Sequence, residues 1–197
     1  MSPTVVSSLV LGTRNPHKIR ELERLLAPAG IAVEPLPEGV ELPPENGSTF
    51  AENAVPKARA AAAATGRPAI ADDSGIEAAA LSGGPGVRSA RYAGDRASDE
   101  ENLRKLVEEV PAGDRLRYVC ALAYVDPASD VEEVFFGECR GTLAAEPRGE
   151  RGFGYDPAFV PADSDGDRTM AELREGDKDA ISHRGRAVRE LVTWLRS

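Results

Sequence analysis

The first 36 residues alternate between apolar runs and a helical stripe of apolar positions. "TVVSSLVLG" at 4–12 is apolar and rich in residues that favour a β-strand. Between 15 and 30 the apolar residues recur at helical spacing, with Asn15 suited to the N-cap and Pro16 to the first helical position. "IAVEPL" at 31–36 predicts a second strand. A strand–helix–strand opening is typical of an α/β protein.

The next stretch predicts a loop followed by a helix. Residues 37–47 are rich in Pro, Glu and Gly, which indicates a loop. Residues 48–66 predict a helix, with Thr49 and Glu52 as a capping box. Because proline lacks the N–H that a helix interior needs, Pro56 is expected to kink or divide this helix.

Two short apolar runs, 68–72 and 76–81, predict two strands with a tight turn between them at "SG". Asp72 and Asp73 would then lie at the carboxyl end of the first strand. Two adjacent acids at this place raise the question of what binds so much negative charge.

The remaining pattern completes an α/β fold with no internal repeat or linker, so residues 1–197 are expected to form one domain. In order, it predicts a basic glycine-rich loop (82–97), a helix (98–110), two antiparallel strands (116–126 and 131–143), a glycine-rich loop running into a strand (147–160), a solvated loop (163–167), a short helix starting at "TMAEL" and a final helix from about Ser182.

The composition limits which binding partners and which cellular compartment fit this chain. The net charge of −9 argues against nucleic acid or an anionic membrane as the main partner, although local cations can still bind a small phosphorylated ligand. The N-terminus lacks the pattern of a signal peptide, and no apolar run approaches the roughly 20 residues that cross a membrane. Cys120 and Cys139 are expected to be reduced, buried thiols of a cytoplasmic protein, although a disulfide between two adjacent strands is geometrically allowed.

"TRNPHK" at 13–18 is the first candidate for ligand chemistry. A turn leading into a helix N-terminus presents unpaired N–H groups and a partial positive charge, which suits phosphate. Thr13 adds a hydroxyl and Lys18 a mobile cation. Taken alone, the same residues also fit an ordinary capped helix with a solvated lysine.

Glu45, Asp72 and Asp73 are the second candidate, because Mg²⁺ takes one or two carboxylates and leaves room for water and phosphate. Adjacent strand residues point to opposite faces, so both aspartates cannot bind one ion unless the chain bends sharply. Asp73 is therefore the expected ligand and base, and Asp72 is expected to orient its neighbours or a cation such as Lys57. Both acids also fit simple caps of the following turn.

Two later stretches carry candidates for binding a planar base. In "GFGYDP" (152–157), Phe153 and Tyr155 can stack on a base, and Asp156 can accept hydrogen bonds. In "KDAISHRGRA" (178–187), His183 and Arg184 can donate to keto oxygens or phosphate. A glycine turn with core aromatics and a surface His–Arg pair are the plainer interpretations.

Taken in order, these motifs resemble one family along nearly the whole chain, the non-canonical purine nucleoside triphosphate pyrophosphatases, also called the Ham1-like family. The matching stretches are "TRNPHKIREL", "ENGSTFAENAVPKAR", "PAIADDSGIEA", "GPGVRSARYAG", "RGFGYDP" and "AISHRG". The resemblance implies hydrolysis of ITP, dITP and XTP to the monophosphate and pyrophosphate, with Mg²⁺ as cofactor. It also implies a long mixed sheet in two lobes with an active-site cleft between them, and a homodimer.

The resemblance further implies roles for particular residues. Glu45 and Asp73 would bind Mg²⁺, with Asp73 also the proton acceptor. The residues implied to contact substrate are Thr13, Arg14, Asn15, Pro16, His17, Lys18, Lys57, Ser74, Phe153, Gly154, Tyr155, Asp156, Lys178, His183 and Arg184.

The chain departs from the family pattern at a few positions. Arg14 stands where glycine is common, Arg151 replaces the first glycine of a common Gly-Gly-Phe-Gly run, and Pro56 interrupts the helix that leads to Lys57. Two other functions stay open: a pyrophosphatase that prefers modified pyrimidine bases, and a nucleotide-binding regulator without catalysis.

Overall fold

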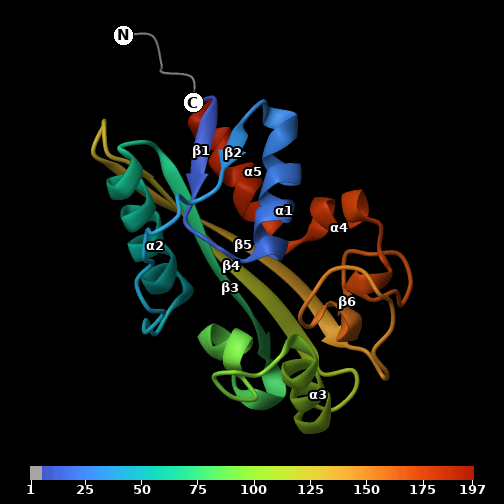
Figure 1. The fold of residues 1–197 in the computed structure, drawn as a ribbon. Coiled ribbons are helices and arrows are strands. Elements are labelled where there is room, and N and C mark those ends of the chain that lie inside the picture. The colour runs from blue at the N-terminus through green and yellow to red at the C-terminus, as the bar shows by residue number, and fades with distance from the viewer. Residues whose placement is uncertain (1–5) are drawn as a thin grey trace. The chain divides into compact units, whose positions relative to one another are not determined.

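Six strands form one mixed sheet in the order β2-β1-β3-β4-β5-β6 in the computed structural model, which describes residues 6–197 (Figure 1). Their bounds are β1 (Ser8–Leu11), β2 (Ala32–Glu34), β3 (Ala69–Ala78), β4 (Arg115–Asp126), β5 (Val131–Leu143) and β6 (Phe159–Pro161). Strand β1 pairs in parallel with both β2 and β3, whereas β5 and β6 are antiparallel. The predicted α/β class is confirmed. Residues 4 and 5 of the first predicted strand lie outside the described residues.

The helices occur where the apolar stripes predicted them, with one addition. They are α1 (Pro16–Leu26), α2 (Phe50–Thr65), α3 (Asp99–Glu109), α4 (Glu175–Ile181) and α5 (His183–Leu195). Helix α4 was not predicted and is separated from α5 by Ser182, whose extended backbone ends it. No helix among residues 6–197 is long and apolar enough to cross a membrane.

The chain divides into two compact units, and neither is a continuous segment. The first comprises residues 1–73, 120–137 and 184–197, and the second comprises 74–119 and 138–183. Strands β3, β4 and β5 therefore contribute residues to both units.

In the first unit, helices pack on both faces of the strands. Helices α1 and α5 lie on one side of β1 and helix α2 on the other (Figure 1). Leu9 and Leu11 of β1 lie in an apolar cluster with α1 and α5, whereas Val10 lies in a cluster with α2. The members contributed by these helices are Leu22, Leu26, Val188 and Leu191 on one face and Ala61 and Ala62 on the other. Because alternate residues of a strand point to opposite faces, this sheet is apolar on both sides.

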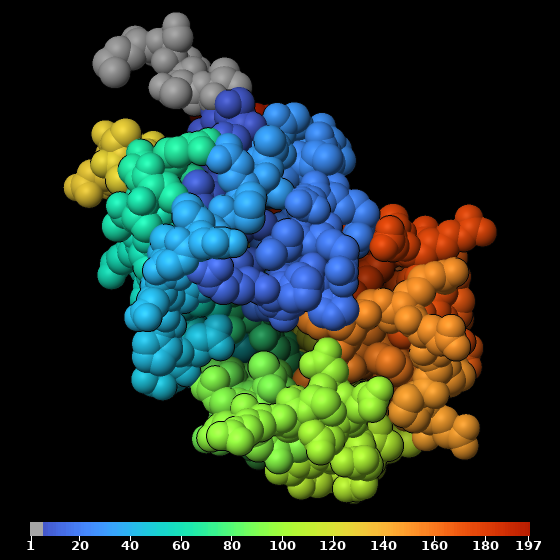
Figure 2. Space-filling view, viewed as in Figure 1, coloured from blue at the N-terminus to red at the C-terminus, as the bar shows by residue number. Residues whose placement is uncertain are grey.

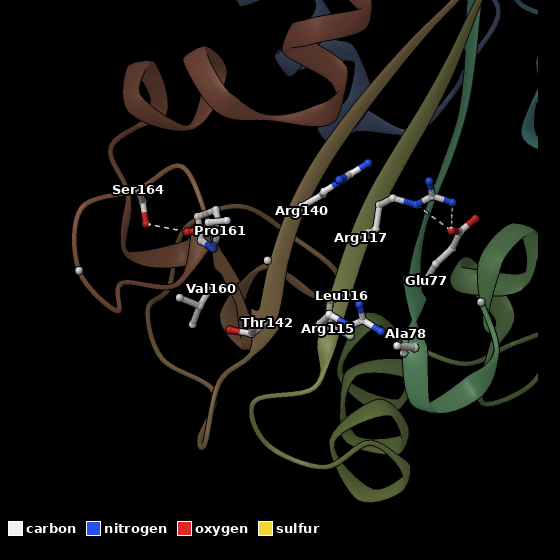
Figure 3. A pocket seen from close by; sticks show the side chains of 15 residues that line it. Glu77, Ala78, Arg115, Leu116, Arg117, Arg140, Thr142, Val160, Pro161 and Ser164 are labelled. Carbon is white, nitrogen blue, oxygen red and sulfur yellow. Dashed lines mark hydrogen bonds and ion pairs between the residues drawn. The ribbon is translucent and has the colours of Figure 1, made fainter.

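In the second unit, one face of the strands carries the core. This cluster joins Ile76 of β3, Leu116 and Tyr118 of β4 and Phe159 of β6 to Leu106 of α3. The opposite face carries polar residues and lines an open pocket of about 540 Å³ (Figure 3). Glu77, Arg115, Arg117 and Arg140 lie around it, and Arg117 bonds Glu77.

Helix α2 corrects two sequence expectations. Thr49 caps it by accepting a hydrogen bond from the Glu52 N–H, but the Glu52 carboxylate binds the Ser48 N–H and hydroxyl, so the expected reciprocal box is wrong. Pro56 lies inside one continuous helix and does not divide it. Burial of the alanine face, including Ala54 and Ala58, offsets the hydrogen bond that Pro56 cannot donate.

Strand β3 is a single strand of 10 residues, so the predicted turn at Ser74–Gly75 is wrong. The turn comes later, at residues 79–84, where Ser82 and Gly83 adopt positive φ. Asp72 and Asp73 consequently lie within an extended strand, and the alternative in which they cap a turn is excluded.

Cys120 and Cys139 are buried and form no disulfide, as predicted.

Candidate active site

Asn15 organises the loop before α1. Its side-chain oxygen accepts hydrogen bonds from the N–H groups of His17 (2.9 Å) and Lys18 (3.3 Å), and its carbonyl accepts from Ile19 (3.0 Å). Thr13 Oγ1 in turn accepts from the Asn15 N–H. The N-cap is confirmed, but the expected unpaired N–H groups in this first turn are occupied by Asn15. Any anion bound here must rely chiefly on the helix dipole and nearby cations.

Lys18 directs its ammonium towards β3. Its Nζ lies 3.2 Å from Asp72 Oδ2 and 3.3 Å from the Asp72 carbonyl, and the side chain is 13% exposed. A cation expected to be mobile is therefore held at the edge of a buried carboxylate.

Asp72 is fully buried and binds Arg184, which is 1% exposed. Arg184 Nε and Nη2 donate to Asp72 Oδ2 at 3.1 and 2.8 Å, and Nη1 donates to Glu21 of α1. The sequence prediction that Asp72 orients cations is therefore met, although the side-chain partners are Arg184 and Lys18, and Lys57 binds the Asp72 carbonyl. Glu21 was missed, because nothing in its helical spacing distinguishes it from a solvated glutamate.

These contacts keep both partners charged. Burial alone would raise the pKa of Asp72, but the positive charges of Arg184, Lys18 and Lys57 outweigh it and hold that pKa well below its usual range. Burial likewise lowers the pKa of Arg184, and Asp72 and Glu21 more than reverse this effect.

Asp73 faces a different set of groups. Asn53 of α2 donates from Nδ2 to Asp73 Oδ2 (2.9 Å), and its Oδ1 accepts from the Gly47 N–H (2.7 Å). One buried amide thus connects Asp73 to the segment that carries Glu45. Asn53 was missed by the sequence reasoning, although the matching stretch "AENAVPKAR" contains it.

Lys57 joins the same group. Its Nζ donates to Glu45 Oε1 at 2.5 Å and to the Asp72 carbonyl at 2.8 Å. Gly12, at the end of β1, has no room for a side chain, since a Cβ there would lie 2.9 Å from the Lys57 carbonyl. This close backbone approach brings β1 and α2 together beside the acids.

The surroundings of Asp73 suit a divalent cation. Burial raises the pKa of Asp73, Lys18 and Lys57 lower it, and the nearby negative charge of Glu45 raises it again, with a net rise. A cation bound between two carboxylates that repel each other lowers their electrostatic energy. Among residues 6–197 no group of three or more His, Cys, Asp or Glu side chains could hold a metal. Two carboxylates are enough for Mg²⁺, which usually keeps several waters.

In the second unit, Asp156 is a hub for the predicted base-binding residues. Its carboxylate accepts from Lys178 Nζ (2.6 Å), the Phe153 N–H (3.0 Å) and the Tyr118 hydroxyl (3.2 Å). Gly152 has positive φ, and a Cβ there would lie 2.0 Å from Asp156 Oδ2. The glycine is therefore required by the close approach of Asp156.

His183 is stacked on Tyr118, with ring centroids 4.6 Å apart and planes within 6°. Tyr118 also contacts the ring of Phe159 at 4.7 Å. Tyr118 was missed because it lies in an apolar run of β4, where its pattern fits the core. The stack fixes the plane in which His183 can present hydrogen bonds.

The other predicted residues lie near these two groups or in their supports. Lys178 Nζ lies 5.3 Å from the centroid of the Phe153 ring, the Gly154 N–H donates to Asp99, and the Tyr155 hydroxyl donates to the Ser89 carbonyl. Ser74 continues β3 directly after Asp73. Pro16 and His17 open α1, and His17 Nδ1 lies 2.9 Å from Arg20 Nη2.

Comparison with known proteins decides the family. The profile of the Ham1 family matches residues 9–194. The chain belongs to the Ham1 family. As a Ham1 protein it is 53% identical over 200 residues to a dITP/XTP pyrophosphatase from Frankia alni, covering 95% of this chain and 96% of the relative.

Solved structures agree with this assignment. A HAM1 protein from Coxiella burnetii is 42% identical and superimposes with a TM-score of 0.84 over 96% of this chain and 98% of its own. A nucleoside-triphosphatase (dITP/XTP pyrophosphatase) from Mycobacterium abscessus is 41% identical, with a TM-score of 0.71 over 93% of this chain and 98% of its own. The sequence resemblance is confirmed.

Proposed function

We propose that this Ham1 protein hydrolyses non-canonical purine nucleoside triphosphates, dITP, ITP, XTP and dXTP, to the nucleoside monophosphate and pyrophosphate. The observation that carries the proposal is the pair of carboxylates at Asp73 and Glu45, with Lys57 bound to Glu45 and Lys18 held beside β3. A triphosphate with about four negative charges requires such a combination of carboxylate-bound metal and cations. The names of the relatives support the substrate class.

Glu45 and Asp73 would hold Mg²⁺, the cofactor proposed here. When bound, this ion offsets negative charge on the triphosphate and assists activation of water. The rise in the pKa of Asp73 by burial and by Glu45 supports this assignment, since a cation relieves both effects.

The side chains of the first unit position and activate the reactants. Lys18 and Lys57 offset charge on the phosphate oxygens as the α–β linkage breaks and pyrophosphate leaves. Asp73 accepts a proton from the attacking water, and Asn53 holds its carboxylate in place. Arg184 acts through Asp72 in this proposal, because its guanidinium is already bound to two carboxylates.

Base selection is assigned to the second unit. Hypoxanthine and xanthine carry a 6-keto acceptor where adenine carries an amino donor. Lys178 and His183 would donate to that oxygen, and a donor left unpaired would penalise adenine. Phe153 and Tyr155 would provide the apolar surface for the purine ring, with Asp156 orienting Lys178.

A cytoplasmic homodimer completes the proposal. The net charge of −9 supports a small-molecule substrate over nucleic acid or an anionic membrane.

A panel of triphosphates with and without Mg²⁺ tests the function. Pyrophosphate release should be fast for ITP, dITP and XTP, slow for ATP and GTP, and absent without the metal. Equal rates for ITP and dUTP would instead favour the pyrimidine alternative. Binding of ITP without any turnover would favour a regulator.

Asp73→Asn tests the proton acceptor. The variant should fold and bind ITP, but Mg²⁺-dependent turnover should fall at least roughly 100-fold, the lower range for loss of a general base. Arg59→Ala, which removes an exposed arginine of α2 bonded to Glu132, serves as the control. Undiminished turnover by the Asp73→Asn variant would remove Asp73 from this role.

A further inference from the structure

Arg14 lies in the stretch expected to bind phosphate, yet its guanidinium is bound to the main chain. Arg14 Nη2 donates to the carbonyls of Pro37 (3.1 Å) and Val40 (2.8 Å). Both carbonyls belong to the segment 37–47, which connects β2 to α2 and carries Glu45. The space-filling view shows the light-blue surface of this segment beside the blue surface of the α1 region (Figure 2).

Segment 37–47 has little hydrogen bonding of its own. It contains no helix or strand, and its internal main-chain bonds are Val40 N–H to Pro37 O (3.4 Å) and Asn46 N–H to Pro44 O (3.1 Å). The segment therefore depends on contacts with the rest of the protein, and the two charge-assisted hydrogen bonds from Arg14 are one such anchor, beside Lys57 on Glu45 and Asn53 on Gly47.

The chain between Val40 and Glu45 is short and restricted, so a contact at Val40 affects the position of Glu45. Val40 and Leu42 pack against the apolar cluster of β1 and α2, and two consecutive prolines follow, each with a fixed φ. Glu45 comes directly after Pro44. Beyond it, Gly47 is bound by Asn53, so the segment is held at both ends and stiff in between.

We propose that Arg14 is a positioning residue that fixes segment 37–47 and thereby sets the place of Glu45, and that it does not bind the triphosphate. The inference rests on the proposed function for its link to Mg²⁺, but the contact itself does not. Arginine can fill this role because the one nitrogen Nη2 carries two N–H groups, which can donate to both carbonyls at once.

Hydrogen exchange on the protein without metal or nucleotide tests the structural part. Arg14→Gly should increase exchange at the Val40, Asn46 and Gly47 amides by about 5- to 30-fold, the size expected for the loss of one or two hydrogen bonds. Exchange rates of these amides in Arg14→Lys should lie between those of the parent protein and those of Arg14→Gly. Arg59→Ala should leave the exchange rates unchanged. Unaltered exchange in Arg14→Gly would overturn the proposal.

Kinetics and calorimetry test the link to the metal. In Arg14→Gly the Mg²⁺ concentration for half-maximal turnover should rise about 5- to 30-fold, with KM for ITP at saturating Mg²⁺ within about 2-fold of the parent. A large rise in KM that Arg14→Lys restores would make Arg14 a phosphate ligand and overturn the proposal. If the parent protein hydrolyses no triphosphate, the proposed function fails, whereas exchange and calorimetric Mg²⁺ titration still decide the role of Arg14.

Discussion

Asp72 and Asp73 are neighbours in the sequence, but their carboxylates have opposite surroundings. Asp72 is bound by Arg184 and Lys18, whose positive charges lower its pKa. Asp73 is bound by Asn53 and lies near Glu45, and its pKa is raised. One acid is therefore a structural partner of buried cations, while the other carries an energetic cost that a bound cation would relieve.

Stability measurements should separate these two roles. Asp72→Asn leaves Arg184 buried with one carboxylate fewer, so urea denaturation should show a loss of about 3–5 kcal/mol. Asp73→Asn removes a charge whose burial is unfavourable, so the free energy of unfolding should change by less than about 1 kcal/mol. Equal losses in the two variants would contradict this assignment.

The cysteines should be chemically inert in the folded protein. Burial, the largest effect, together with the negative charge of Asp72 raises the pKa of Cys120 to about 12, and the thiolate is the reactive form. Cys139 is also buried. An aromatic disulfide reagent at pH 8 should modify neither thiol until urea is added and should then titrate two. Rapid modification of the native protein would exclude this environment.

Residues whose role depends on nearby sequence were predictable, and residues whose role depends on distant partners were not. Asn15 could be identified as an N-cap because its partners are two and three residues away. Glu21 binds Arg184 across 163 positions, and Tyr118 contacts His183 from an apolar strand. No local pattern indicates such pairings. Family resemblance supplied Lys178, but not Asp156, the partner that holds it.

At the scale of elements, predictions from local composition were wrong where tertiary contacts determine the conformation of the backbone. "DDSG" has the composition of a turn, but the Ile76 N–H bonds Ser89 Oγ, and the strand continues to Ala78. Helix α3 shows the opposite case, since Ser98 and Glu101 form the capping box that the sequence predicted.

Helix α2 allows the low helix propensity of Pro56 to be compared with the packing of this residue in the folded protein. Pro56 costs roughly 3 kcal/mol relative to alanine in a helix interior, and part of this is returned because proline restricts the unfolded chain. Pro56→Ala should therefore stabilise the protein by about 2 kcal/mol, measured by urea denaturation. A destabilised variant would indicate that the proline ring makes packing contacts worth more than the missing hydrogen bond.

At the scale of the whole molecule, the sequence was sufficient for the fold class and the order of most elements. The alternation of strands and helices predicted an α/β protein, which the six-stranded sheet confirms. The division into two compact units was not readable from the hydrophobic pattern, because the boundaries at 73 and 119 fall within continuous strands. Neither unit can be expressed as one uninterrupted fragment.

Removal of metal should inactivate the protein without unfolding it. Glu45 is bound by Lys57 and Asp73 by Asn53, so the carboxylates have protein partners in the absence of an ion. After treatment with a chelator the Tm should stay within about 3 °C, corresponding to less than ~1 kcal/mol, while turnover is lost and returns with Mg²⁺. A chelator-induced collapse of Tm would show that the ion is part of the fold.

Side chains of β3 alternate between the two faces of the sheet, and this alternation limits where residues can be inserted or deleted. Successive strand residues face opposite sides, so with the preceding chain held in place, deletion of a single residue between Ala69 and Asp72 would move Asp73 to the position beside Arg184 and Ser74 to the position beside Asn53. Such a shift would place Asp73, the proposed metal ligand and base, against the buried guanidinium of Arg184 and away from Asn53. Insertions and deletions in this chain are therefore expected at loop tips, and in the first half of β3 only as compensated pairs.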